Sequence, residues 1–235
     1  MRIGLFGGSF DPVHSGHVGI ARRAVSDLAL DRLVVLPAAV NPFKAGAPQG
    51  FSPARRLALA RIAFTGVAKV AVDGRELERG GVSYAIDTVR EFSAENPGAE
   101  LFYIVGEDSL AGLPRWKDAD ELLKLCTFKA YPRTVESSSE IRRRLESGEG
   151  IGTLVPESVE LFLRHGVVCN PDGATADLVY GGVLRKDGFC PCRLPKTDEF
   201  ACPCAEFKSQ LADSAFSGLC HCRLYLKPEG KESEK

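Results

Sequence analysis

The run from Gly7 to His17 constrains the fold of this 235-residue chain more than any other feature. It reads Gly-Gly-Ser-Phe-Asp-Pro-Val-His-Ser-Gly-His, follows an apolar stretch from Ile3 to Phe6 and leads into a helical pattern from Gly16. Glycines let the backbone approach a ligand closely, and a helix N-terminus offers unpaired N–H groups and a positive dipole end. A strand, a glycine turn and a helix start in this order therefore predict an anion site.

Two imidazoles set this turn apart from a generic phosphate loop. His14 and His17 are three residues apart, so both can face one bound group from the first turn of a helix. The run lacks the Gly-Lys-Ser/Thr ending of P-loop kinases and ATPases, and it lacks the spacing of a dinucleotide-binding fold. Ordinary polar roles at a helix start are the alternative explanation, and the preceding glycine turn favours phosphate binding over them.

Composition narrows the class of protein. The net charge is -1, and Lys and Arg are scattered along the chain, so there is no electrostatic case for nucleic acid binding. No apolar run is long enough to span a bilayer, and the chain start leads directly into a predicted core strand rather than a signal peptide. We therefore expect a cytoplasmic protein with no nucleic acid or membrane partner.

Strand-like and helix-like segments alternate along most of the chain. Strands are predicted at residues 2–6, 33–36, 67–72 and 101–105, and helices at residues 16–27, 53–64, 85–95, 119–125, 138–147 and 156–164. Such alternation predicts an α/β protein with a Rossmann-like parallel sheet, in which ligands bind at the carboxyl ends of the strands. The glycine-histidine run, Lys44 and the turn at Gly106–Ser109 are expected to gather there.

Several segments resemble the nucleotidylyltransferase superfamily, and in particular bacterial nicotinate-mononucleotide adenylyltransferases. The run from Gly7 to His17 is similar to the GGxFDPxHxGH signature of that superfamily. The other segments that carry the resemblance are Asn41–Lys44, Ser83–Thr88, Phe102–Leu110, Trp116-Lys117 and Ser137–Arg142. The resemblance covers residues 1–168, which we take as one domain.

The resemblance implies transfer of AMP from ATP to nicotinate mononucleotide, giving deamido-NAD and pyrophosphate in NAD biosynthesis. The substrate phosphate can attack the α-phosphorus directly, so catalysis consists of alignment and charge neutralisation. We expect His14 and His17 to hold the ATP phosphates, Lys44 and Arg142 to contact the leaving pyrophosphate, and Mg²⁺ to arrive with ATP. The other implied contacts are the nucleotide-binding residues Gly7, Gly8, Ser9, Phe10, Gly106, Asp108, Ser138 and Ser139, and the substrate-binding residues Tyr84, Ala85 and Trp116.

Plainer explanations exist for several of these side chains. Lys44 and Arg142 are equally accounted for as solvated surface charges, and Asp108 as a turn residue. Trp116 is the single tryptophan of the chain, and it fits a packing role as well as it fits ring stacking on a substrate. These alternatives stay open at the level of the sequence.

Two departures from the resembling family bear on the substrate. Only a few residues separate Arg133 from Ser137, where that family has a longer segment with a further strand. Ala85 stands where the family commonly has threonine, so a hydroxyl that could contact the substrate carboxylate or amide is missing. Nicotinamide mononucleotide and pantetheine phosphate therefore stay open as alternative substrates.

Six of the eight cysteines form three Cys-x-Cys pairs between Cys190 and Cys222. Structural zinc sites usually use Cys-x-x-Cys knuckles and four ligands, whereas six thiols divide into four ligands for an iron–sulfur cluster and two for a disulfide. A zinc-binding interaction module or a disulfide staple is the alternative. Outside the pairs, we expect Cys126 to be a buried hydrophobe and Cys169 to lie at a junction between domains.

The order Cys-Pro-Cys, Cys-Pro-Cys, Cys-His-Cys resembles the catalytic chain of ferredoxin–thioredoxin reductase. That resemblance implies a small, loop-rich α+β iron–sulfur domain at residues 169–228, followed by a charged tail at 229–235. It also implies thiol–disulfide reduction, with a ferredoxin-like electron donor and a thioredoxin-like target. By position, the ligands of a [4Fe–4S] cluster are Cys190, Cys202, Cys204 and Cys220, the redox-active pair is Cys192 and Cys222, and the proton donor is His221.

Overall fold

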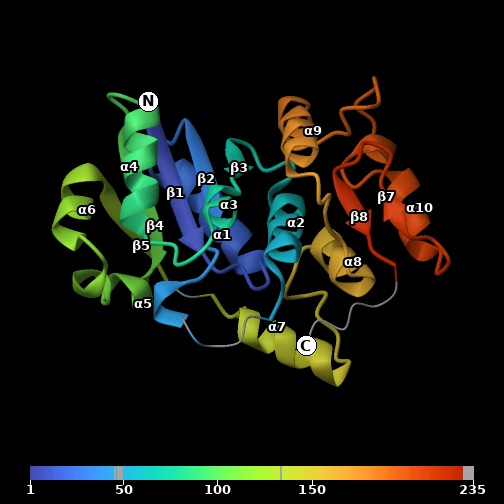
Figure 1. Ribbon diagram of the computed structural model, residues 1–235, viewed down its shortest axis with the longest axis horizontal. Coiled ribbons are helices and arrows are strands. Elements are labelled where there is room, and N and C mark those ends of the chain that lie inside the picture. Colours follow the sequence, from blue (N-terminus) through green and yellow to red (C-terminus); the bar gives the residue numbers. More distant parts are fainter. Residues whose placement is uncertain (45, 47–49, 133, 230–235) are drawn as a thin grey trace. The chain divides into compact units, whose positions relative to one another are not determined.

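The computed structural model describes residues 1–44, 46, 50–132 and 134–229, apart from the side chain of Lys44 (Figure 1). These residues pack into two compact units, each made of several chain segments. Unit 1 consists of Met1–Phe10, Ser15–Pro48 and Lys69–Ser137, and unit 2 of Asp11–His14, Gln49–Ala68 and Ser138–Lys235. The predicted division at residues 168 and 228 stays a prediction, and the predicted tail lies, from residue 230 on, outside the described residues.

Unit 1 is built around a sheet of five parallel strands in the order β3-β2-β1-β4-β5. The strands are β1 (Arg2–Gly8), β2 (Arg32–Pro37), β3 (Val70–Val72), β4 (Glu100–Gly106) and β5 (Thr127–Tyr131). β1 lies at the centre, where Phe6 pairs with Val35 of β2 and with Ile104 of β4. The strand order reverses at β1, as in doubly wound sheets. The predicted Rossmann-like parallel sheet is confirmed.

Helices α4 (Ala85–Glu95) and α6 (Ala119–Leu125) cover one face of this sheet, and Figure 1 draws them beside it. Alternate residues of the strands, such as Leu5, Leu36 and Tyr103, join one buried cluster with Ile86 and Leu122 of these helices. Successive side chains of a strand point to opposite faces, so every second residue reaches this cluster. Burial on both faces explains why the central strands are almost continuously apolar.

Two strands differ from the sequence-based expectation. β3 begins at Val70 rather than Val67, because Lys69 adopts a left-handed φ of 62° that interrupts the extended chain. β5 was not predicted at all. It lies at the edge of the sheet with Thr127 and Lys129 exposed, so its sequence lacks the continuous apolar run of a central strand.

The other helices of unit 1 are α1 (Ser15–Asp27), α3 (Arg75–Arg79) and α5 (Glu107–Leu110), with 3₁₀ turns η1 (Pro42–Lys44) and η2 (Leu113–Arg115). The helices predicted at residues 16–27, 85–95 and 119–125 agree with α1, α4 and α6 to within one residue. α3 and α5 were missed because one turn of helix is too short to show an apolar period.

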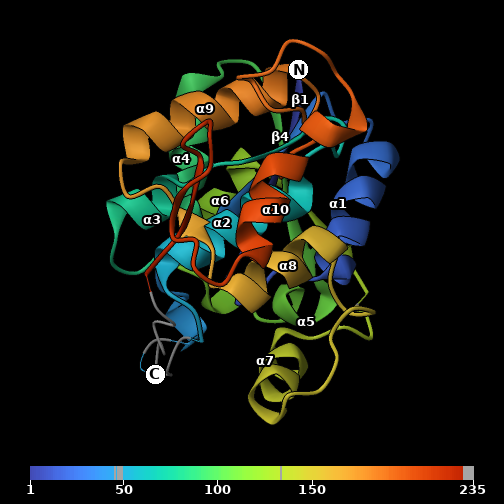
Figure 2. The same ribbon diagram turned by 90° about the vertical axis from the view of Figure 1, so that its right-hand side faces the viewer.

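Unit 2 combines helices with a small antiparallel sheet (Figure 2). Its helices are α2 (Pro53–Phe64), α7 (Ser138–Ser147), α8 (Glu157–His165), α9 (Gly173–Arg185) and α10 (Ala205–Ala212), with a 3₁₀ turn η3 (Asp198–Phe200). Its strands β6 (Val168–Cys169), β7 (Gly218–Leu219) and β8 (Tyr225–Lys227) pair in the order β6-β8-β7. The predictions for α2 and α7 are confirmed residue by residue, and the prediction for α8 is confirmed to within one residue.

Helix α9 occupies a segment that the sequence analysis expected to be rich in loops. Asp172 caps its start, because the carboxylate accepts the N–H of Thr175 at 3.2 Å and its hydroxyl at 2.6 Å. Gly182, inside this helix, has a packing cause. A Cβ there would lie 2.8 Å from the Cβ of Pro191, so only glycine allows this close approach.

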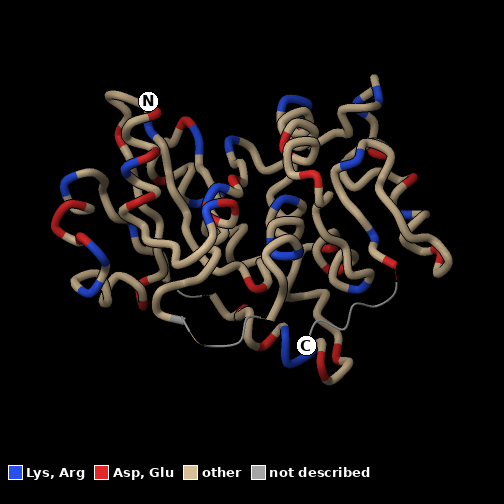
Figure 3. The backbone as a smooth tube through the Cα atoms, in the orientation of Figure 1, with Lys and Arg blue, Asp and Glu red and all other residues tan. Residues whose placement is uncertain are grey.

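No helix among the described residues is long and apolar enough to cross a membrane. In Figure 3, segments with Lys and Arg are interspersed with segments with Asp and Glu along the tube. On α7, for example, Glu140 pairs with Arg143 at 2.8 Å and with Arg144 at 2.7 Å. The structure thus shows mixed rather than striped charge, as the sequence indicated.

Candidate active site

The central strands β1 and β4 of unit 1 end side by side, at Gly8 and Gly106. The predicted nucleotide contacts Gly7 and Gly8 are the last residues of β1, and Ser9 and Phe10 follow directly. In doubly wound sheets, ligands bind outside the carboxyl ends of the strands, where the strand order reverses. The glycine run therefore lies where the sequence analysis predicted a ligand site.

Aromatic packing holds the predicted catalytic residue His17 in the first turn of α1. Its ring centroid lies 4.9 Å from that of Phe10 and 6.1 Å from that of Phe6. Phe10 itself is buried and adopts a left-handed φ of 46°, which turns its ring back onto this cluster. Gly16 has to be glycine, because a Cβ would lie 2.8 Å from the Cβ of Thr134. The imidazole is thus oriented by its neighbours.

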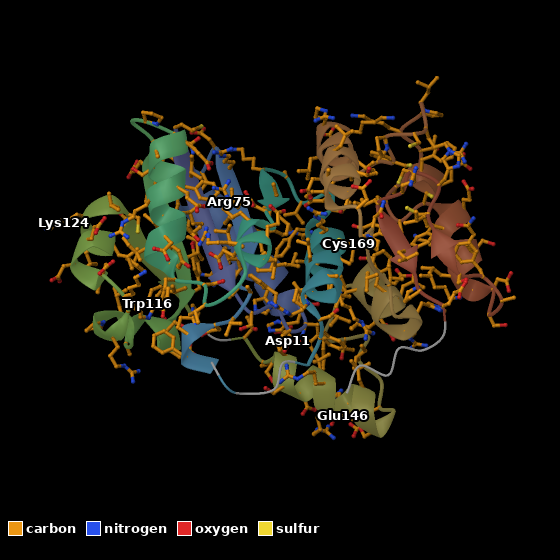
Figure 4. All side chains as sticks on the ribbon, in the orientation of Figure 1. Asp11, Arg75, Trp116, Lys124, Glu146 and Cys169 are labelled. Carbon is orange, nitrogen blue, oxygen red and sulfur yellow. The ribbon has the colours of Figure 1, made fainter. Side chains whose placement is uncertain are left out.

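Asp11 joins three segments of unit 2, and the sequence analysis did not single it out. Its carboxylate accepts the backbone N–H of Gly50 at 2.8 Å and that of Phe51 at 2.9 Å (Figure 4). Arg142 of α7 donates to the backbone carbonyl of Asp11 and lies 3.5 Å from its carboxylate. The only sequence signal for this role is an acidic residue inside the motif, because its partners lie 39 or more residues away.

His14 belongs to the same group of contacts in unit 2. It is 7% exposed and follows Asp11, Pro12 and Val13, which are also buried. The hydroxyl of Ser138, at the start of α7, donates to the backbone carbonyl of Pro12 at 2.9 Å. Unit 2 thus brings together the segment of His14 with the predicted residues Ser138 and Arg142, whereas Ser139 is exposed on α7.

The predicted substrate residues of unit 1 pack on one apolar cluster. Tyr84, Ala85 and Trp116 all lie half-buried against the buried core of the sheet face. The ring of Trp116, labelled in Figure 4, meets that of Tyr103 edge-on at 5.7 Å and that of Phe128 at 5.9 Å. Trp116 therefore has the packing role that the sequence analysis left open, and it is only partly buried.

A buried polar network fixes the start of α4, next to Tyr84. The hydroxyl of Ser83 accepts the backbone N–H of Ala39, just after β2, at 2.9 Å. Ser83 also hydrogen-bonds the buried carboxyl of Glu76, which accepts the hydroxyl of Thr88 at 2.7 Å. Burial raises the pKa of Glu76, and these hydrogen bonds oppose the rise only in part. Sequence analysis missed Ser83 and Glu76, because their partners come from separate segments.

Replacing Glu76 by glutamine is expected to flatten the pH dependence of stability. Since the folded-state pKa is raised, the contribution of this carboxyl is present below the unfolded pKa of about 4.3 and is lost as pH rises through the folded value. Glutamine can still accept the hydroxyl of Thr88 and carries no charge. Urea unfolding from about pH 4 to about pH 8 should show the variant losing less stability than the parent. Identical pH profiles would contradict this role for Glu76.

The remaining predicted nucleotide residues lie at the end of β4. Gly106 precedes α5, and Asp108 is exposed within that helix, with its carboxylate accepting the N–H of Ser109 at 3.0 Å. This contact is the turn-stabilising role that the sequence analysis gave as its alternative. Lys44 ends the 3₁₀ turn η1, and its side chain lies outside the described part of the structure.

The six paired cysteines gather in unit 2 as neighbouring thiols. The sulfur atoms of Cys220 and Cys222 are 3.6 Å apart, and the thiol of Cys190 hydrogen-bonds those of Cys204 and Cys222. Contacts with Cys204 and Cys222 lower the pKa of Cys190, and Cys222 lowers that of Cys220 to about 7. Cys192 is exposed, whereas the other seven cysteines are buried or half-buried.

These contacts do not support the predicted cluster site. Among the described residues, no group of three or more His, Cys, Asp or Glu could hold a metal ion, and all eight cysteines are free of disulfides. Cys190 contacts Cys204, which is also a predicted cluster ligand, but both Cys190 and Cys220 contact Cys222, which was predicted to be a redox cysteine. The predicted [4Fe–4S] cluster therefore has no support from the arrangement of these residues.

The two other cysteines have separate environments. Cys126 is buried in the core of unit 1, where burial raises its pKa to about 12, so the predicted buried hydrophobe is confirmed. Cys169 is buried in β6 of unit 2, and its sulfur lies 3.7 Å from the guanidinium of Arg61. Burial raises the pKa of Cys169 to about 11 even beside this cation. Neither thiol has the lowered pKa of a reactive cysteine.

Comparison with known proteins places this arrangement among nucleotide-transferring enzymes. A family model described as cytidylyltransferase-like matches residues 5–158. A probable nicotinate-nucleotide adenylyltransferase of Gemmatimonas aurantiaca is 40% identical over 191 residues, covering 69% of this chain and 90% of the relative. One of Albidiferax ferrireducens is 43% identical over 147 residues, covering 62% and 73%.

Solved structures agree at the level of the fold. The nicotinic acid mononucleotide adenylyltransferase of Plasmodium falciparum, complexed with NaAD, matches with a TM-score of 0.55 and 16% sequence identity. The match covers 70% of this chain and 96% of that one. The glycine run at the end of β1, the two histidines and the extent of the family match lead to one conclusion. The chain belongs to the cytidylyltransferase-like family.

Proposed function

We propose that this protein transfers AMP from ATP to nicotinate mononucleotide, giving deamido-NAD and pyrophosphate. The observation that carries this proposal is the 40% identity with a probable nicotinate-nucleotide adenylyltransferase over nine-tenths of that relative. The glycine run at the end of β1 and the start of α1 supply the matching phosphate-binding geometry.

In this proposal the chain aligns two phosphates and neutralises charge. The phosphate of nicotinate mononucleotide attacks the α-phosphorus, a new P–O bond forms, and the bond to the pyrophosphate leaving group breaks. His14 and His17 donate hydrogen bonds to the ATP phosphates, and Arg142 and Lys44 neutralise the leaving pyrophosphate. Mg²⁺ enters as part of the MgATP substrate, held by phosphates and water.

We assign two sets of residues to binding, one to the nucleotide and one to the pyridine ring. We assign the nucleotide to Gly7, Gly8, Ser9, Phe10, Gly106, Asp108, Ser138 and Ser139. Tyr84, Ala85 and Trp116 take the pyridine ring, which the half-buried face of Trp116 favours. Because Ala85 offers no hydroxyl to the substrate carboxylate, other backbone or side-chain donors have to select nicotinate over nicotinamide.

Turnover with competing phosphates tests the substrate. The purified protein is supplied with MgATP and, in separate assays, with nicotinate mononucleotide, nicotinamide mononucleotide or pantetheine phosphate, and pyrophosphate release is measured. We expect the highest kcat/KM with nicotinate mononucleotide. A higher kcat/KM with nicotinamide mononucleotide or pantetheine phosphate would show that this compound is the substrate. The reaction would still be AMP transfer. No pyrophosphate release with any of them would overturn the proposed activity.

We propose, as a second function, that the C-terminal thiols carry out disulfide reduction. The supporting observation is that six thiols lie together in unit 2 and that Cys192 is the exposed one. Cys192 attacks a thioredoxin-like target disulfide, forming a mixed disulfide and releasing one target thiolate. Cys222 then displaces the target, leaving a Cys192–Cys222 disulfide, while His221 supplies a proton. Two electrons from a ferredoxin-like one-electron donor and two protons restore both thiols.

Metal analysis tests whether the thiols of this second proposal hold an iron–sulfur cluster. A [4Fe–4S] cluster on Cys190, Cys202, Cys204 and Cys220 predicts about four irons and four acid-labile sulfides per chain in protein purified without oxygen. One zinc without sulfide would instead indicate a zinc-binding interaction module. The matched functional test is Cys192→Ser, which we expect to abolish disulfide reduction and to leave AMP transfer unchanged. Retained disulfide reduction in that variant would contradict the role of Cys192.

A further inference from the structure

A cavity of about 530 Å³ lies within unit 2, and none of the residues that line it is assigned to AMP transfer or to thiol chemistry. Its lining residues come from α2, the end of α8, the start of β6, the loop before β7 and the end of β8. Small-molecule sites in proteins typically measure about 300–1,000 Å³. The cavity is therefore large enough for a ligand of the size of a nucleotide or a sugar phosphate.

The lining of this cavity is strongly basic. Arg55, Arg164, His165 and Lys227 line it, and Glu229 is the acidic residue of the lining. The ammonium group of Lys227 donates to two backbone carbonyls, of Leu211 at 3.3 Å and of Asp213 at 2.7 Å. Neutral carbonyls orient this group without cancelling its charge. The cation is thus held in place while its positive charge still acts on the cavity.

The two arginines are oriented in a similar way. Arg55 donates to the backbone carbonyl of Leu163 at 2.9 Å, and its guanidinium lies 4.5 Å from the ring centroid of Phe51. Arg164 forms an ion pair with Glu160 at 2.5 Å, but its own side chain is 67% exposed, so water weakens this pair. These contacts hold both guanidinium groups at the wall of the cavity.

The pKa of His165 reflects the positive charges around the cavity. This pKa is lowered, first by burial and then by the charges of Lys227 and Arg164. Burial is the larger cause, and the contribution of Lys227 and Arg164 shows that both positive charges act at the position of His165. Half-buried Phe216 adds an apolar wall, and the exposed Ser214 and Ser217 add hydroxyl donors.

We propose that this cavity binds a small phosphorylated molecule. Two guanidinium groups, an ammonium group and hydroxyls match the donors that phosphate oxygens accept, and Phe216 can contact the organic part of the ligand. The site goes beyond the proposed catalytic functions and does not depend on them, since no catalytic residue lines it. Because α2 and β8 both contribute, a bound ligand would link the segment after residue 49 to the cysteine-containing segment within unit 2.

The test uses the full chain and the imidazole NMR signals of its four histidines, with inorganic pyrophosphate and AMP as probes. We expect each probe to shift the signal of His165, assigned with His165→Gln, and to raise its pKa as negative charge enters the cavity. His14 and His17 report separately on binding at the proposed catalytic site. Shifts at these two residues without a shift at His165 would overturn the proposal.

A charge-matched pair of variants completes the test. Lys227→Gln should weaken binding at the His165 site about tenfold or more, as expected for loss of one charge-assisted contact. Lys208→Gln removes an exposed lysine of α10 that does not line the cavity and should leave the affinity unchanged. Equal weakening by both would show nonspecific charge attraction and overturn the proposal. If Lys227→Gln fails to fold, Arg164→Gln takes its place, and an unchanged affinity there would count against the site.

Discussion

Replacing His17 by asparagine is expected to lower kcat for AMP transfer by about 10²- to 10³-fold, the usual cost of one lost donor to developing charge. Asparagine keeps a polar side chain in the first turn of α1 but cannot reach as far as the imidazole does. The ring of His17 is oriented by Phe10 and Phe6, so its loss removes a positioned donor rather than a mobile one. Steady-state kinetics with MgATP and nicotinate mononucleotide measures the change.

The matched control for this variant is Lys124→Gln, which removes an exposed charge of α6 outside the site. It should keep the parent kcat and KM, and both variants should unfold in urea close to the parent midpoint. If His17→Asn has the same kcat as the parent protein, His17 does not contact the phosphates. The imidazole would then be a packing partner of Phe10 only.

Replacing Asp11 by alanine is expected to lower both stability and kcat. The change leaves the backbone N–H groups of Gly50 and Phe51 without their acceptor, and it removes the carboxylate beside Arg142. A fully buried donor left unpaired costs about 1–3 kcal/mol, and because these two are part-buried, a loss of about 1–2 kcal/mol in the free energy of unfolding is expected. The segment that ends in His14 also loses its anchor, so kcat should fall about tenfold or more.

The variant Asp11→Asn separates positioning from stability. Its amide oxygen can accept one of the two N–H groups, but it carries no charge for Arg142, so stability should recover more than kcat does. Kinetics is measured at a temperature where each variant is fully folded. A normal kcat in folded Asp11→Ala would show that Asp11 only stabilises the fold, and that the segment of His14 keeps its place without it.

The fold of unit 1 could be predicted largely because its signals are local. The ends of α4 and α6 were predicted to the residue, since each helix carries an apolar face long enough to show its period. β5 was missed because it is an edge strand with Thr127 and Lys129 exposed, so its sequence lacks the continuous apolar run of a central strand. In unit 2, α9 was missed because the segment from residue 169 on was expected to be loop-rich, as the resemblance to the reductase chain implied.

Site residues that belong to one continuous motif could be predicted from the sequence. Residues that act through contacts with distant segments could not. The glycine run, His14 and His17 form one continuous pattern, so their place at the end of β1 could be expected. Asp11 accepts the N–H of Gly50, 39 residues away, and Ser83 that of Ala39, 44 residues away, and no local pattern reveals such contacts. For the cysteines, spacing predicted that they gather but not which thiols touch.

Arg61 of α2 links two separate chain segments within unit 2. Its buried guanidinium pairs with Asp177 of α9, lies 4.7 Å from the ring centroid of Tyr180 and contacts Cys169 (Figure 4). If the segment after residue 168 were lost, this arginine would keep its charge and lose its acid, its ring and its thiol together. Because the guanidinium is buried against these partners, the environment of Arg61 depends on the segment after residue 168.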